Sequence, residues 1–196
     1  MSRRRVTFLV GLFAASLAMR TQLVGVGPLL PRIRADLDVS HAVGGLLVTI
    51  PVLCTGLIAP PAPFFARSFG ARVAISAGLG ATAVFGVARA LAPGAAGVLL
   101  LTIPIGIGLG LAQALLPVAV KEHAAEGPAF ATGVYVTGFS VGSAAATALA
   151  VPAADAFDGW RGAFVAFGLF AGVIVFVWLA LTRSHAPHTR SRAPRP

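Results

Sequence analysis

The stretch Ala90–Val120, ALAPGAAGVLLLTIPIGIGLGLAQALLPVAV, contains no Asp, Glu, Lys or Arg. A helix needs about 20 apolar residues to cross the hydrocarbon core of a bilayer, so this stretch is long enough to span one. Its apolar residues show no period of two, which a membrane-spanning β-strand would require. The stretch therefore predicts a transmembrane α-helix.

The rest of the chain repeats this pattern. The predicted spans cover residues 6–31, 42–65, 73–91, 96–120, 130–152 and 162–182. Only the first and the third contain a charged residue, Arg20 and Arg89 respectively. Across all 196 residues, 57% are hydrophobic, 11% are charged and the mean hydropathy is +0.89, far from the values of a soluble domain. We predict an all-α membrane protein with a six-helix bundle at residues 1–182 and a disordered basic tail at 183–196.

The first span has an alternative interpretation as a secretory signal. Arg3, Arg4 and Arg5 precede an apolar stretch that reaches small residues near Ala18, as a signal peptide would. Hydrophobicity resumes after Arg20 and continues to Leu30, however, which favours a full membrane span.

Orientation follows from the distribution of positive charge, because cytoplasmic loops are enriched in Lys and Arg. With the N-terminus inside, ten basic residues fall in the cytoplasm: Arg3, Arg4, Arg5, Arg67, Arg72, Lys121, Arg183, Arg190, Arg192 and Arg195. Four fall outside: Arg32, Arg34, Arg89 and Arg161. We predict a multi-pass protein of the cell (inner) membrane with both termini in the cytoplasm.

Several functional classes find no support in the sequence. The net charge of +9 lies at helix ends and in the tail rather than on one folded face, which favours membrane topology and anionic lipid over nucleic acid. Cys54 is the single cysteine, so no internal disulfide can form, and no metal-binding or cofactor motif is present. His185 and His188 in the tail are expected to be solvated. We predict no cofactor, no metal site and no enzymatic activity.

Small residues and prolines suggest how the helices pack. Ala74, Gly78, Thr82, Gly86 and Ala90 recur every four residues, and shorter repeats occur at Gly106 and Gly110 and at Gly138 and Gly142. Small residues let membrane helices approach closely, so these stripes predict helix contacts. Prolines within or near the spans predict kinks at Pro28, Pro51, Pro104 and Pro117.

Arg20 is the residue that most strongly suggests a function. It lies near the middle of the first span, and the six acidic residues all lie in predicted loops or at their edges. An arginine at the centre of a membrane helix costs about 2.5–3.5 kcal/mol on insertion scales, so a partner or a wet cavity is expected. An anionic substrate would supply the missing charge. The alternative is a structural Arg20 that bonds to backbone carbonyls near Pro28 or to a carboxylate on another chain.

Gln113 and Tyr135 are the next polar residues inside the spans. The predicted topology puts both at a similar depth, in the half of the membrane nearer the cytoplasm. They are candidates to hydrogen-bond a ligand, or else to bond each other or a backbone carbonyl.

Two short motifs resemble the major facilitator superfamily. The loop Ala66–Arg72, ARSFGAR, is similar to a degenerate form of the loop signature of that family, with Arg67 where an Asp is usual and with Gly70 and Arg72 retained. Gly159–Arg161, GWR, resembles a recurrent feature before the sixth helix.

The resemblance is closest to the cyanate and nitroimidazole transporter branch. Besides Arg20, five segments carry it: Val26–Leu30 (VGPLL), Thr49–Cys54 (TIPVLC), Gly106–Gly110 (GIGLG), Leu115–Lys121 (LLPVAVK) and Gly133–Tyr135 (GVY). The resemblance covers all six helices and implies the N-terminal half of a twelve-helix fold.

This resemblance implies transport by alternating access, in which two six-helix halves rock around a central site. Arg20 would neutralise a small anion such as cyanate or a carboxylate, and Gln113 and Tyr135 would orient it. Lys121, Arg67 and Arg72 are candidates for a gate or interface at the cytoplasmic end. One half cannot rock against itself, so the expected partners are the lipid bilayer, the anion, and a second six-helix half or a second copy. The alternatives are a fragment, or a truncated membrane scaffold in which Arg20 is expendable.

Overall fold

A computed structural model describes residues 3–124 and 126–182, which are helical apart from short connections and contain no strand. The elements are α1 (Arg3–Val24), α2 (Val26–Leu37), α3 (His41–Ile58), α4 (Ala62–Phe69), α5 (Ala71–Leu91), α6 (Gly94–His123), α7 (Pro128–Ala156) and α8 (Trp160–Thr182). Six helical segments in this part are long and apolar enough to cross a membrane, and α1 with α2 counts as the first. The predicted tail, with His185 and His188, lies outside the described residues.

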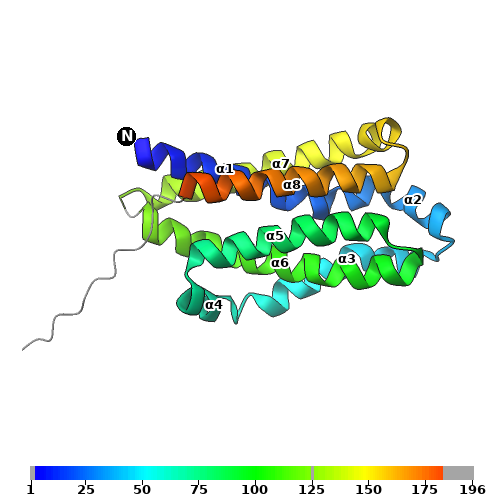
Figure 1. Cartoon of the computed structure of the whole chain (residues 1–196), viewed down its shortest axis with the longest axis horizontal. Coiled ribbons are helices and arrows are strands. Elements are labelled where there is room, and N and C mark those ends of the chain that lie inside the picture. The colour runs from blue at the N-terminus through cyan, green and yellow to red at the C-terminus, as the bar shows by residue number, and fades with distance from the viewer. Residues whose placement is uncertain (1–2, 125, 183–196) are drawn as a thin grey trace, which may run out of the picture.

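The long helices lie side by side along one axis of the molecule (Figure 1). The beginning of α1 and the end of α8 meet at the same end, where the rings of Phe8 and Trp178 are 6.4 Å apart. We call this the terminal end and the opposite one the distal end. This placement is what an even number of crossings requires.

The first span is broken in the middle. A turn at Gly25 separates α1 from α2, and α2 continues to Leu37, beyond the predicted end at residue 31. Pro28 has no N–H to donate to the carbonyl of Val24, four residues earlier, which weakens the helix at this point. The first span is therefore two helical segments joined at Gly25.

The second span is shorter than its sequence suggests. α3 ends at Ile58 rather than at residue 65, because Pro60 and Pro61 follow and cannot continue the hydrogen-bonding pattern. The apolar residues beyond them form the separate short helix α4, which carries Arg67 at the terminal end.

The predicted small-residue stripes are confirmed as packing surfaces. A Cβ added at Gly78 of α5 would clash with the backbone carbonyl of Gly108 on α6. A Cβ added at Gly106 or Gly110 of α6 would likewise clash with atoms of α3. One added at Gly138 or Gly142 of α7 would clash with atoms of α1. At these glycines two helix backbones lie close together, as small residues allow in lipid, whereas Gly86 in the α5 stripe faces the Gln22 side chain of α1.

Polar groups join three helices at the distal end. Trp160, at the start of α8, donates its indole N–H to a carboxylate oxygen of Asp36 on α2 at 3.1 Å. Arg161 lies 3.6 Å from the same carboxylate and donates to the carbonyls of Ala90 and Ala92 at the end of α5. The Gly-Trp-Arg motif therefore joins α2, α5 and α8.

Candidate functional site

Arg20 lies on α1 and is half-buried in the bundle. Its guanidinium carbon is 4.5 Å from the centre of the Phe139 ring on α7. Its Nε is buried without a hydrogen-bond partner, and Arg20 makes no hydrogen bond or ion pair within the described residues. The predicted lack of a carboxylate partner therefore holds for this part of the chain.

The close crossing of α1 and α7 places Arg20 against Phe139. Gly138 faces Ser16 and the backbone of Phe13, and Gly142 faces the backbone of Leu17. Side chains on a helix point toward its N-terminus, which directs Arg20 along α7 toward Phe139. The hydroxyl of Ser16, one turn earlier, donates to carbonyls of its own helix and adds no free polar group.

Tyr135 joins the same group through Phe139. The two rings are 5.8 Å apart with an interplanar angle of 78°, an edge-to-face contact. Arg20, Phe139 and Tyr135 thus form one continuous row, which we call the Arg20 cluster. Phe139 was not predicted as a site residue, although it lies one helical turn after Tyr135.

Gln113 is not joined to the Arg20 cluster by any hydrogen bond. It lies half-buried on α6 beside the fully buried Ala112, and its carboxamide makes no hydrogen bond within residues 3–124 and 126–182. The predicted ligand-binding roles of Arg20, Gln113 and Tyr135 remain predictions.

The three candidate gate residues lie at the terminal end in different surroundings. Lys121 is exposed in the last turn of α6, and Arg67 is exposed on α4. Arg72 is half-buried and donates to the Thr182 hydroxyl and to the Leu179 carbonyl, both at 2.9 Å. Arg72 therefore caps the end of α8, whereas Lys121 and Arg67 are exposed cations.

A second intramembrane arginine, Arg89, was assigned to the outside by the charge count, but its side chain is fully buried in α5. It donates to the side-chain oxygen of Gln22 on α1 at 3.0 Å, and its guanidinium carbon lies 4.3 Å from the centre of the Phe164 ring. Gln22 was not predicted either. Gln22 could have been recognised as a candidate because it is a polar residue inside the first span, only two residues after Arg20.

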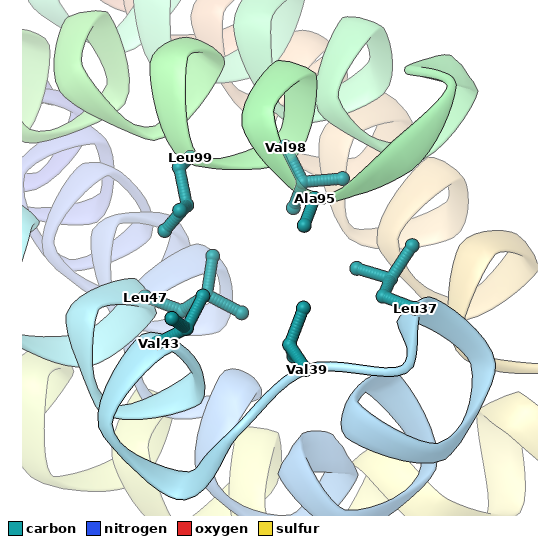
Figure 2. Close-up of a pocket in the computed structure, with 7 residues that line it drawn as sticks. All are labelled: Leu37, Val39, Val43, Leu47, Ala95, Val98 and Leu99. Carbon is teal, nitrogen blue, oxygen red and sulfur yellow. The ribbon is translucent and has the colours of Figure 1, made fainter.

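Two cavities between the described helices are lined mainly by apolar side chains. One of them, of about 10 Å³, lies at the distal end, and Figure 2 shows the apolar side chains that line it, which come from the end of α2, the α2–α3 connection, α3 and α6. That volume holds at most a single water molecule. A larger groove of about 440 Å³ lies between α1, α7 and α8 and is lined by alanine, leucine, proline and phenylalanine with Thr21. Neither includes Arg20.

A bundle of six membrane-length helices is typical of an integral membrane protein, and an arginine inside it that has no ion-pair partner among the described residues marks a candidate site. Residues 6–196 match the family model of the Major Facilitator Superfamily. The chain belongs to this superfamily of transporters, as its sequence motifs predicted.

The chain is similar to three curated transporters. It is 32% identical over 193 residues to a 2-nitroimidazole transporter of Escherichia coli (strain K12), covering 97% of this chain and 49% of that protein. It is 27% identical over 176 residues to the uncharacterised transporter YycB of Bacillus subtilis (strain 168), covering 89% and 44%. It is 27% identical over 170 residues to the cyanate transport protein CynX of Escherichia coli (strain K12), covering 87% and 44%. The chain thus spans about half the length of these relatives.

Proposed function

We propose that this chain is one half of a transporter for a small anion and that Arg20 binds the anion. The observation that carries the proposal is the unpaired guanidinium of Arg20 inside the bundle, stacked on Phe139 at 4.5 Å. The names of the relatives, a cyanate transport protein and a 2-nitroimidazole transporter, support a small solute.

The stacking geometry suits an anion site. A ring under the guanidinium plane covers the face of the cation and leaves its N–H edge free to donate. That edge matches the two oxygens of a carboxylate or a nitro group, and it also suits the end of a linear anion such as cyanate. Tyr135, on the far side of Phe139, supplies a hydroxyl that donates or accepts, and Gln113 supplies an unused carboxamide.

Membrane energetics support the same role. A charged group in the hydrocarbon region is stabilised by a partner of opposite charge or by water, and the described acidic residues all lie near helix ends. An anion that entered from water would supply the missing negative charge beside Arg20 and would leave Arg20 without a partner again when it departed. Binding to Arg20 would then be reversible, as transport requires.

Transport also requires a second half. In this family two six-helix units rock around a central site, and each of the relatives is about twice as long as this chain. α3 is the span with the smallest buried share and packs mainly on α6 and α2, so most of its surface is open to lipid or to another helical unit. We propose a second six-helix half or a second copy as the partner, with both termini in the cytoplasm.

The test is uptake of labelled cyanate and small carboxylates into liposomes that contain the chain alone or with a candidate second half. The variants are Arg20→Ala and Arg20→Lys, with Arg32→Ala as the matched control, because Arg32 pairs with Asp155 at the surface of the distal end. We expect Arg20→Ala to abolish uptake, Arg20→Lys to retain a small fraction of it, and Arg32→Ala to leave it unchanged.

Unchanged flux in Arg20→Ala would overturn the anion site. Absence of flux for every anion, with every candidate partner, would favour a membrane scaffold over a transporter.

A further inference from the structure

Just before the break at Gly25, Gln22 contacts two other helices through three polar groups. Gln22 is 1% exposed and lies one turn before Gly25. Its side-chain oxygen accepts from Arg89 Nη2 at 3.0 Å, and its backbone carbonyl accepts from the same nitrogen at 3.5 Å. Its side-chain nitrogen donates to the Phe164 carbonyl of α8 at 3.5 Å. Gln22 therefore connects the broken span to both α5 and α8.

Arg89 has no carboxylate partner in the described residues, and only its Nη2 is hydrogen-bonded, because Nε and Nη1 are buried without a partner. Arg89 is 0% exposed and forms no ion pair in the described part of the chain. It lies in the last turn of α5, where the helix dipole is negative, and the Phe164 ring covers one face of the guanidinium at 4.3 Å. With two Gln22 oxygens added, four weak sources of negative potential surround one cation.

The surrounding packing leaves little room for Gln22 to move. A Cβ added at Gly86 of α5 would clash with the Gln22 carboxamide, and one at Gly25 would meet the Phe167 ring of α8 at 2.8 Å. The absence of side chains at these two positions lets α1 approach α5 and α8 closely at the break. Rotation or sliding of α1 would therefore require the contact with Arg89 to open.

Arg20 lies only two residues before Gln22 on the same helix. A change in the rotation or depth of α1 at the break moves Arg20 relative to Phe139, since 1.5 Å of rise and 100° of rotation separate successive residues. A contact that fixes α1 at Gln22 therefore also fixes the backbone position of Arg20.

We propose that Arg89 is a positioning residue that holds the α1–α2 break in one geometry through Gln22 and thereby positions Arg20. This inference rests on the proposed function for its consequence but not for the contact itself. Arg89 does not touch the anion in this scheme.

The first measurement is independent of transport. In a Cys54→Ala background, spin labels at Ala35 on α2 and Ala96 on α6 report the position of α2 at the distal end, and labels at Ser68 on α4 and Ala129 on α7 form a control pair at the terminal end. All four positions are exposed.

We expect Arg89→Leu to broaden the distance distribution of the distal pair only. Arg89→Lys, which keeps the charge but loses the planar fork, should give an intermediate width, and Gln22→Leu should resemble Arg89→Leu.

An unchanged distance distribution for the distal pair in Arg89→Leu overturns the proposal. Equal broadening of both pairs also overturns it, because that would mean a general loss of packing.

The second measurement is cyanate affinity. We expect Arg89→Leu to weaken binding about tenfold at an unchanged maximal uptake rate, and by clearly less than tenfold when it is combined with Arg20→Lys, which retains some uptake. Additive losses would overturn positioning through Arg20. If the unmodified chain binds no cyanate, the proposed function fails, and the spin-label result alone decides whether Arg89 holds the break.

Discussion

Arg72 and Arg161 occupy equivalent positions on two antiparallel helices, and each donates to the far end of the other helix, Arg72 to one backbone carbonyl and a hydroxyl and Arg161 to two backbone carbonyls. Arg72 is the second residue of α5 and bonds to Leu179 in the last turn of α8. Arg161 is the second residue of α8 and bonds to Ala90 and Ala92 at the end of α5. Each arginine satisfies carbonyls that have no partner within their own helix. The two helices are thus joined at both ends of the bundle.

Removing either arginine is expected to lower stability. Arg161→Ala and Arg72→Ala should each cost about 1–2 kcal/mol, below the full range for charged hydrogen bonds because both side chains are only partly buried. Their effects should add, because the length of α5 separates the two contacts. Thermal unfolding in detergent, followed by the fluorescence of the buried Trp160 and Trp178, measures both values.

The control is Arg67→Ala, which removes an exposed arginine with no hydrogen bond or ion pair in the described chain and should change little. A cost for Arg67→Ala equal to that of Arg72→Ala would contradict a specific role for the cap.

Substitution of the glycines between α1 and α7 should separate close packing from helix propensity. A Cβ at Gly142 would lie 2.9 Å from Leu17 Cα, so Gly142→Ala should destabilise the bundle by about 1–3 kcal/mol. Gly133→Ala on the same helix meets no atom within 4 Å and should be neutral or stabilise by about 0.5–1 kcal/mol. The same unfolding assay compares them, and similar losses for both would show that α1 and α7 do not cross as described.

Phe139→Leu tests the ring beneath Arg20. A cation–π contact stabilises by about 0.5–2 kcal/mol. If its loss weakens anion binding by that free energy, the KM for cyanate uptake should rise between about twofold and about thirtyfold. Phe130→Leu, an exposed phenylalanine on the same helix, is the matched control and should leave KM unchanged. An unaltered KM in Phe139→Leu would separate the Arg20 cluster from substrate binding.

Two aspartates at the distal end should differ in their effect on stability. Asp36→Asn weakens contacts with both Trp160 and Arg161 and should lower the unfolding temperature measurably. Asp155→Asn removes a carboxylate that is 62% exposed and that pairs, among the described residues, only with Arg32. Exposed pairs of this kind are worth about 0–1 kcal/mol. Added salt should abolish the small effect at Asp155. A larger loss at Asp155 than at Asp36 would contradict the assignment of Asp36 as the junction of α2 and α8.

Much of the fold was predictable because hydrophobicity and charge act on each segment separately. A segment without charge and with about 20 apolar residues has a lower free energy as a helix in lipid, whatever its neighbours are. The number of spans could therefore be predicted from the sequence, and the family followed separately from the motifs that resemble it. The end of α3 at Ile58 differs from the predicted end at residue 65, although Pro60 and Pro61 are a signal for it in the sequence, because the prediction weighed the apolar residues beyond them more heavily.

The candidate site was predictable only in part. Arg20 stands out in the sequence because a charge inside an apolar segment needs no tertiary information to be recognised. Phe139 and Gln22 do not stand out, because a phenylalanine or a glutamine in a membrane helix becomes significant only through the cation beside it.

The sequence by itself determined that the chain forms six membrane spans, that it belongs to a transporter superfamily, and that Arg20 is unusual, because each depends on local composition or on motif order. Only the tertiary structure decided which arginines have partners. Arg20 and Arg89 are both isolated charges in apolar segments, yet Arg89 is fully buried against Gln22 and Phe164, whereas Arg20 is half-buried with no hydrogen bond to the described chain. The difference arises from helix crossings at Gly86 and Gly138, and residues far apart in sequence meet there only after the bundle has formed.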